Sequence, residues 1–356
     1  MLRGSLDIIV LLSRCSIAGI SSKRDSELSR IKPINDVVTF SHTFLKSLED
    51  SVKAVIHSIL ESIVMVMVGK DACVNGQTNN DCFNSSLATG FYVDKNIILS
   101  AHHVVKKFGN GDNLYVLTYD GDYSKASIIA ESKDDDIIFL ATERNGKPLN
   151  IRNAVADIGS IVLSAGFAYG LLRYFITYGF VSGLDVKASV DDTELEGLML
   201  LNMPILPGMS GAPIIDIYGN VVGMAISRSV LFNELSLAIP STRIARDLLM
   251  LKKFGRIVTV KLGLKLLQSS SLLKNLRAEN GVIVVGILNK KLVDICKVGV
   301  GDILVEANNM KINSIEDLRN IVAMAVINNS AIYLQFKSPN SEFVKQCVVD
   351  VDTLIM

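Results

Sequence analysis

A series of short apolar segments constrains the fold of this chain most strongly. They begin at Ile63, end near Pro240, are rich in valine and isoleucine, and are separated by turn residues. Segments of this length and composition are typical of β-strands, and Asp94-Lys95 between two of them predicts a tight hairpin turn. The pattern favours an all-β barrel or sandwich over repeated βαβ units. The main segments are 63–68, 88–93, 96–100, 114–118, 127–130, 137–141, 161–165, 175–182, 197–202 and 235–239.

Two stretches have helical spacing instead. Apolar residues recur at three- and four-residue intervals between 40 and 60, which predicts an amphipathic helix or two. A second helix is predicted at 242–254, where Ser241 is the expected N-cap and Gly255 follows the last turn. We expect this second helix to mark the boundary between two domains.

Composition limits the function classes. The chain has 356 residues, 49% of them hydrophobic and 20% charged, which is enough for a sizeable core and more than one domain. Its formal net charge is zero, so the clustered basic surface of a nucleic-acid-binding protein is not expected. The sequence shows no metal-ligand spacing, and we expect neither a metal nor another cofactor.

The N-terminus resembles a weak secretory signal peptide over residues 1–18. An apolar core at 8–12 follows Arg3, and cleavage after Ala18 is sterically plausible, but Asp7 and Arg14 lie close to that core. Retention of the segment as a membrane anchor stays open. Residues 19–60 are expected to form a leader and the first helical segment.

Cys73 and Cys82 bracket a polar, asparagine-rich loop. In an oxidising compartment they would be able to close a small disulfide loop. Two unrelated thiols are an equally good interpretation.

The strongest chemical motif is Pro207-Gly208-Met209-Ser210-Gly211-Ala212-Pro213. Gly208 has access to backbone conformations that other residues avoid, so successive N–H groups can turn inward beside the Ser210 hydroxyl. A hydroxyl beside such donors suits acyl transfer, with Gly208 and Ser210 as the expected oxyanion hole. The alternative is an ordinary Gly-Ser turn between two buried strands.

A base and an orienting carboxylate are also present. His102 and His103 end an apolar strand, and a shift of one residue reverses the side-chain face, so only one of them can serve as the base. Asp136 precedes another apolar strand, where it would be shielded enough to orient an imidazole.

These motifs resemble the HtrA/DegP family of envelope serine proteases. Ser100-Ala101-His102-His103-Val104 resembles the family's Thr-Asn-Asn-His-Val, and Asp136-Ile137-Ile138-Phe139-Leu140 resembles its Asp-Ile-Ala-Leu-Leu. The serine motif resembles Pro-Gly-Asn-Ser-Gly-Gly-Pro, with Met209 and Ala212 as departures. The resemblance implies a catalytic triad of His103, Asp136 and Ser210. It also implies a chymotrypsin-like double β-barrel, which we place at residues 61–255.

Residues 256–356 resemble a PDZ domain, an α+β module that binds peptide C-termini. The likeness rests on Lys261-Leu262-Gly263-Leu264, on Gly301-Asp302-Ile303-Leu304, and on a helix capped by Ser314. It implies that the backbone N–H groups of Leu262, Gly263 and Leu264 hold the terminal carboxylate. A single PDZ domain resembles the regulatory members of the family, which are generally homotrimers, and Phe40 and Phe44 are candidates for the trimer contact.

The sequence therefore predicts a mainly β protein that acts as a serine endopeptidase on misfolded or unfolded envelope proteins in the periplasm. Peptide binding to the PDZ domain would regulate it. The alternative is a catalytically weak relative, suggested by Met209 and Ala212, that works as a peptide-binding or chaperone module.

Overall fold

The computed structural model describes residues 34–69, 86–107, 113–118, 120–170, 174–190, 193–228, 235–258, 262–268, 281–338 and 343–353. The predicted signal peptide at 1–18 and the Cys73/Cys82 pair lie outside these ranges. The chain divides into two compact units, residues 1–53 and 54–356.

The N-terminal helix α3 (Ile34–Ile59) is longer than the sequence predicted, because it begins before residue 40. Phe44, Leu45 and Leu48 are exposed on it, whereas Ile56 and Ile59 near its end are buried. None of the helices in the described ranges has the length and apolar character needed to cross a membrane.

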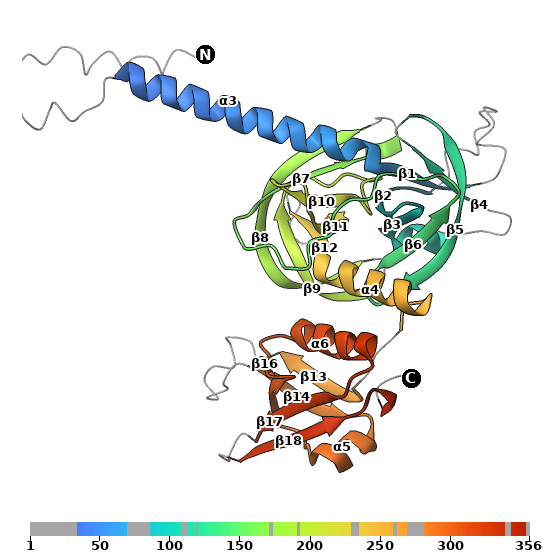
Figure 1. Cartoon of the computed structure of the whole chain (residues 1–356), viewed down its shortest axis with the longest axis vertical. Helices are drawn as coiled ribbons and strands as arrows, with labels where there is room; N and C mark the ends of the chain where they lie inside the picture. Colours follow the sequence, from blue (N-terminus) through green and yellow to red (C-terminus); the bar gives the residue numbers. More distant parts are fainter. Residues whose placement is uncertain are drawn as a thin grey trace, which may run out of the picture. The chain divides into compact units, whose positions relative to one another are not determined.

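The predicted strands form two closed six-stranded barrels (Figure 1). The first has the order β1-β2-β3-β6-β5-β4 and the second the order β7-β8-β9-β12-β11-β10, so both barrels share one topology. This confirms the predicted chymotrypsin-like double barrel. The strands of the first barrel are β1 (Ile63–Gly69), β2 (Ser86–Asp94), β3 (Ile97–Ala101), β4 (Asn113–Leu117), β5 (Tyr123–Ser132) and β6 (Ile137–Thr142). Those of the second are β7 (Ile161–Gly166), β8 (Phe175–Val190), β9 (Thr193–Asn202), β10 (Pro213–Asp216), β11 (Val221–Arg228) and β12 (Ser236–Pro240).

Helix α4 (Ser241–Phe254) follows the second barrel. The predicted Ser241 cap is wrong: Pro240 occupies the N-cap position, and no side chain caps the helix. The Ser241 hydroxyl instead donates to the Ala154 carbonyl oxygen at 3.3 Å, which ties the start of the helix to a distant loop. At the other end Gly255 has the left-handed conformation expected of it, with φ of 66°.

The C-terminal region is a sheet with the order β13-β14-β15-β17-β18, to which β16 adds by pairing with β15. Its helix α6 begins with the predicted Ser314 cap, which forms a reciprocal capping box with Asp317. The elements are β13 (Leu264–Gln268), β14 (Val282–Ile287), α5 (Lys290–Cys296), β15 (Ile303–Ala307), β16 (Met310–Lys311), α6 (Ile315–Asn328), β17 (Ile332–Lys337) and β18 (Val344–Val349).

A disulfide joins Cys296 at the end of α5 to Cys347 in β18. Both cysteines are buried in the core of the C-terminal sheet. This pair was not predicted, because the two residues lie 51 positions apart without a recognisable spacing.

Candidate active site

His103 and Asp136, predicted as base and orienting carboxylate, are in direct contact. His103 lies in the 3-10 helix His102–Lys107 that follows β3, and Asp136 immediately precedes β6. The Nδ1 atom of His103 is 2.7 Å from Asp136 Oδ2, and the His103 backbone N–H donates to Asp136 Oδ1, also at 2.7 Å. Because Asp136 accepts both bonds, it fixes the ring orientation that a general base needs.

The neighbouring His102 points to a different partner. Its side chain is buried and its Nε2 atom is 3.1 Å from Glu131 Oε2 on β5. Its backbone N–H donates to the Asp136 carbonyl oxygen at 3.0 Å. Of the two imidazole rings, only that of His103 is hydrogen-bonded to the Asp136 carboxylate.

Asp136 has an unusual backbone conformation for a residue with a side chain. Its φ is 52°, in the left-handed region, which stores strain at this turn. The preceding residue, Asp135, is buried and bonded to Arg243 and Arg246 of α4. Nothing in the sequence near Asp136 pointed to these two arginines.

Ser210 lies beside the end of β3. A Cβ on the adjacent Gly211 would come within 2.6 Å of Ser100 Oγ and 3.0 Å of Ala101 N. The Ser210 hydroxyl donates to the Ile226 carbonyl oxygen at 2.9 Å. In the described part of the chain, no hydrogen bond joins Ser210 to His103. Rotation about one side-chain bond would free the hydroxyl from Ile226.

The loop before Ser210 has its carbonyl groups anchored away from the predicted oxyanion site. Pro207 O accepts from Tyr169 N–H at 2.7 Å, and Gly208 O accepts from the Thr89 hydroxyl at 2.8 Å. Three further carbonyl oxygens accept hydrogen bonds at 2.9 Å: Leu206 O accepts from Met209 N–H, Met209 O from Ala212 N–H, and Ser210 O from Thr89 N–H.

The N–H groups of the same loop divide into two kinds. Met209 and Gly211 donate to carbonyl oxygens of Leu206 and Ala225. By contrast, no oxygen within the described ranges accepts from the N–H of Gly208 or Ser210. These are the two donors predicted for the oxyanion hole, and both remain available to a ligand oxygen.

Thr89, in β2 of the first barrel, holds this arrangement together. Its fully buried hydroxyl accepts from Phe167 N–H at 2.9 Å while donating to Gly208 O. This role of Thr89 left no local pattern in the sequence, since its partners are 78 and 119 positions away.

Met209 and Ala212, the departures from the family motif, are buried in the core of the second barrel. The backbone bonds of Met209 hold the loop without a polar side chain at that position. The loss of the family's asparagine is therefore compatible with an ordered oxyanion loop.

The predicted peptide-binding residues lie at an edge of the C-terminal sheet. Leu262 and Gly263 precede β13, which Leu264 begins, and β13 pairs with β14 alone in the described sheet. Gly263 has φ of 72°, and its carbonyl oxygen accepts from Leu288 N–H and Asn289 N–H at 2.7 and 3.0 Å.

Residues 88–224 match the family model of the trypsin-like peptidase domain. A Haemophilus influenzae protein named "Probable periplasmic serine protease do/HhoA-like" is 26% identical over 238 residues, which cover 64% of this chain and 50% of that protein. "Serine endoprotease DegS" of the same organism is 24% identical over 257 residues, which cover 70% of this chain and 72% of that protein. The chain spans about half the length of the curated relatives it matches first.

Solved structures show the same fold. The structure titled "HtrA-type protease AlgW with tripeptide" superposes with a TM-score of 0.61 at 16% identity, covering 83% of this chain and 95% of that one. A serine endoprotease from Yersinia pestis superposes with a TM-score of 0.53 at 18% identity, covering 83% of this chain and 96% of that one. Residues 88–224 thus match a trypsin-like peptidase domain, and the chain is similar to the HtrA, DegP and DegS serine endoproteases.

Proposed function

We propose that the protein is a serine endopeptidase with His103, Asp136 and Ser210 as its triad. His103 would take the Ser210 proton as the hydroxyl attacks a peptide carbonyl, and would later protonate the leaving amine. Asp136 would hold the histidine tautomer, and the N–H groups of Gly208 and Ser210 would bind the oxyanion. The observation that carries this proposal is the pair of N–H groups that have no acceptor among the described residues, in a loop whose carbonyl groups are hydrogen-bonded elsewhere.

A fluorophosphonate probe tests this proposal on the purified full-length protein. The probe forms a covalent bond to an activated serine, so mass spectrometry should locate it on Ser210. The Ser210→Ala variant should remain unlabelled and should not degrade an unfolded model substrate. Labelling elsewhere, or degradation by Ser210→Ala, would overturn the mechanism.

A second candidate is a catalytically weak module that binds peptides or acts as a chaperone. The hydrogen bond from the Ser210 hydroxyl to Ile226 O favours it, because that bond directs the hydroxyl proton away from a base. Absence of labelling together with normal peptide binding would support this candidate over the endopeptidase.

We also propose that residues 61–255 form the protease domain and residues 256–356 a regulatory PDZ domain. An exposed strand edge such as that of β13 accepts an extended peptide as an added strand, and the backbone at Leu262, Gly263 and Leu264 would hold its carboxylate. A peptide with a free C-terminus should therefore bind more tightly than its amidated form. Equal affinity for the two would contradict this binding mode.

Misfolded or unfolded proteins of the periplasm are the proposed substrates, and the periplasmic location is supported by the names of the relatives, which call them periplasmic. The buried disulfide between Cys296 and Cys347 supports an oxidising compartment. N-terminal sequencing of the mature protein would test whether the segment at 1–18 is removed as a signal peptide or kept as an anchor.

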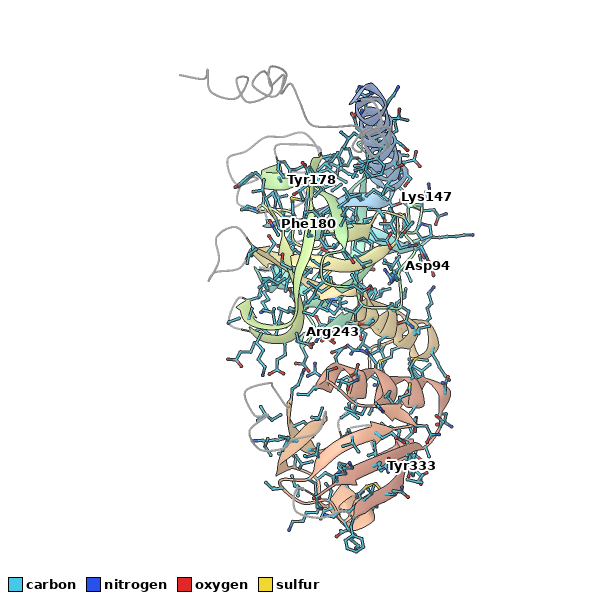
Figure 2. All side chains as sticks on the ribbon, turned by 90° about the vertical axis from the view of Figure 1, so that its left-hand side faces the viewer. Asp94, Lys147, Tyr178, Phe180, Arg243 and Tyr333 are labelled. Carbon is cyan, nitrogen blue, oxygen red and sulfur yellow. A yellow bond between two sulfur atoms is a disulfide. The ribbon has the colours of Figure 1, made fainter. Side chains whose placement is uncertain are left out.

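A homotrimer is proposed as the assembly. Ile161, Tyr178 and Phe180 are exposed on the paired strands β7 and β8, Tyr178 at 74% of its surface, and such apolar surfaces often mark protein contacts (Figure 2). Phe44 on α3 is also exposed. Light scattering should give three times the chain mass for the wild type, and a smaller mass for Tyr178→Ser with Phe180→Ser.

A further inference from the structure

A buried cluster of charges links the turn that carries Asp136 to the C-terminal region. Arg243 and Arg246 project from α4 and bind carboxylates on two sides, and we name this pair the arginine clamp. Figure 2 marks Arg243, whose side chain is 1% exposed. No part of the proposed proton transfer uses the clamp.

On one side the clamp holds Asp135. Arg243 Nη1 donates to Asp135 Oδ1 at 3.1 Å, and Arg246 donates to Asp135 Oδ2. Each oxygen of that carboxylate is therefore bonded to a different guanidinium. Because Asp135 is joined to Asp136 by one peptide bond, its position constrains the left-handed backbone of Asp136.

On the other side the clamp holds Glu316, in the first turn of α6. Arg243 Nη2 is 2.9 Å from Glu316 Oε2, and Arg246 Nη1 is 3.3 Å from Glu316 Oε1. An apolar contact accompanies these bonds, since Met250 of α4 packs with Ala323 and Ile327 of α6. One pair of guanidinium groups thus serves both the active-site turn and the C-terminal region.

The charged groups of the clamp and its two carboxylates are buried, which makes their ion pairs costly to break. The side chains of Arg243, Arg246, Asp135 and Glu316 are at most 12% exposed. Arg246 also donates to Asp247 Oδ1, and Arg243 to the Glu196 carbonyl oxygen. A buried ion that loses any of its charged partners is still strongly disfavoured, so movement of one carboxylate forces the guanidinium groups to readjust. Displacing Glu316 therefore also shifts Asp135, and displacing Asp135 also shifts Glu316.

We propose that Asp135 is a positioning residue for the catalytic Asp136, and that Glu316 of the C-terminal region completes its support through the arginine clamp. The inference rests on the proposed endopeptidase function and adds a route of regulation to it. A change in the C-terminal region that displaces Glu316 would loosen the Asp136 turn and slow turnover, with substrate affinity unchanged.

Four full-length variants test the route: Asp135→Asn, Glu316→Gln, the two combined, and Asp294→Asn as a matched control. Asp294 is an exposed carboxylate on α5 of the same C-terminal region. The kcat and KM for an unfolded fluorescent protein substrate are measured per reactive Ser210, counted by fluorophosphonate titration, so that unfolded molecules do not enter the rate.

Asp135→Asn should lower kcat by about tenfold or more with KM within about twofold, because a small displacement of a catalytic group is costly while binding is unaffected. Glu316→Gln should lower kcat by about threefold, and in the Asp135→Asn background it should have almost no further effect, since both act through one element. Asp294→Asn should match the wild type.

Unchanged kcat in Asp135→Asn would overturn the positioning role. An unchanged or raised kcat in Glu316→Gln, or fully multiplicative effects in the double variant, would overturn the route through the clamp. Failure of the proposed function is distinguishable from these results, because the wild type and Asp294→Asn would then also lack Ser210 labelling.

Discussion

Thr89 shows how much one buried hydroxyl can determine. It belongs to the first barrel, yet it sets the backbone of the loop before Ser210 in the second barrel by donating to Gly208 O. Its oxygen also accepts from Phe167 N–H, so both of its hydrogen-bonding roles are in use. Removing the hydroxyl would leave the buried Phe167 N–H and the partly buried Gly208 O without this partner.

Thr89→Val should therefore impair the oxyanion loop while preserving side-chain volume. Each unpaired buried group costs about 1–3 kcal/mol, and a displaced oxyanion donor lowers the rate by about 10²–10³. We expect kcat, measured per folded molecule, to fall by about 10²–10³-fold. Thr89→Ser keeps the hydroxyl and should retain most activity. A Val variant as fast as the wild type would contradict the assigned role.

At this scale the resemblance to the HtrA/DegP motifs selected His103 and Asp136 as partners, and their side chains are in contact. The sequence did not predict that Asp135 would be held by arginines more than a hundred positions later. A carboxylate in an acidic triplet usually lies in a solvated turn, and only the packed position of α4 makes this one buried. Long-range polar contacts of this kind leave no local pattern.

Among the elements, the loop between β9 and β10 depends on Gly208. Its φ is 93°, and a Cβ there would lie 2.3 Å from Phe167 O. That carbonyl belongs to backbone, so it cannot move aside cheaply. The loop conformation that leaves the Gly208 N–H unused is therefore open only to glycine.

Gly208→Ala should abolish Ser210 labelling, whereas Gly219→Ala should not. Gly219 has a similar φ of 87°, but a Cβ there would have no atom within 4 Å. The control variant should lose only about 1–2 kcal/mol of stability for its backbone strain. Comparing the two by fluorophosphonate labelling separates a steric effect on the loop from general glycine strain. Equal labelling of both variants would disprove the steric argument.

Element boundaries followed the sequence where local chemistry decides them. The Ser314 cap and the Gly255 helix end were predicted because each depends on residues only a few positions apart. The Ser241 cap was wrong because its hydroxyl has a tertiary partner, Ala154 O. Strand β8 extends to Val190, well beyond the predicted 182, since its exposed half pairs with β9 and lacks a continuous apolar run.

In the molecule as a whole, the disulfide between Cys296 and Cys347 stabilises a region distant in sequence from the triad. A cross-link of this kind typically contributes about 2–4 kcal/mol. Replacing both cysteines by serine should lower the unfolding free energy of the C-terminal region by about that amount, as measured by denaturant titration. The rate of Ser210 labelling in the folded protein should stay within about twofold, and a much larger loss would show that the cross-link also supports the active site.

The charge cluster between α4 and α6 should make stability depend on pH. Burial raises the pKa of the Asp247 carboxyl to about 6 from 3.8; Arg246 opposes this shift, while Asp135 and Glu316 add to it. Burial also acts to raise the pKa of Asp135, but Arg246 and Arg243 hold it below its usual value. Of these two carboxyls, Asp247 is therefore the one that keeps its proton in the folded state under mildly acidic conditions.

A raised pKa in the folded state means that the native protein binds more protons than the unfolded chain, so this contribution to stability falls as pH rises from about 4 to 6. The shift corresponds to about 3 kcal/mol. Asp247→Asn removes the titration. Denaturant unfolding at pH 4 and pH 7 should therefore show the variant gaining about that much stability relative to the wild type over this range. Parallel pH profiles for the two proteins would show that Asp247 titrates normally, and the buried cluster would then have to carry its full negative charge.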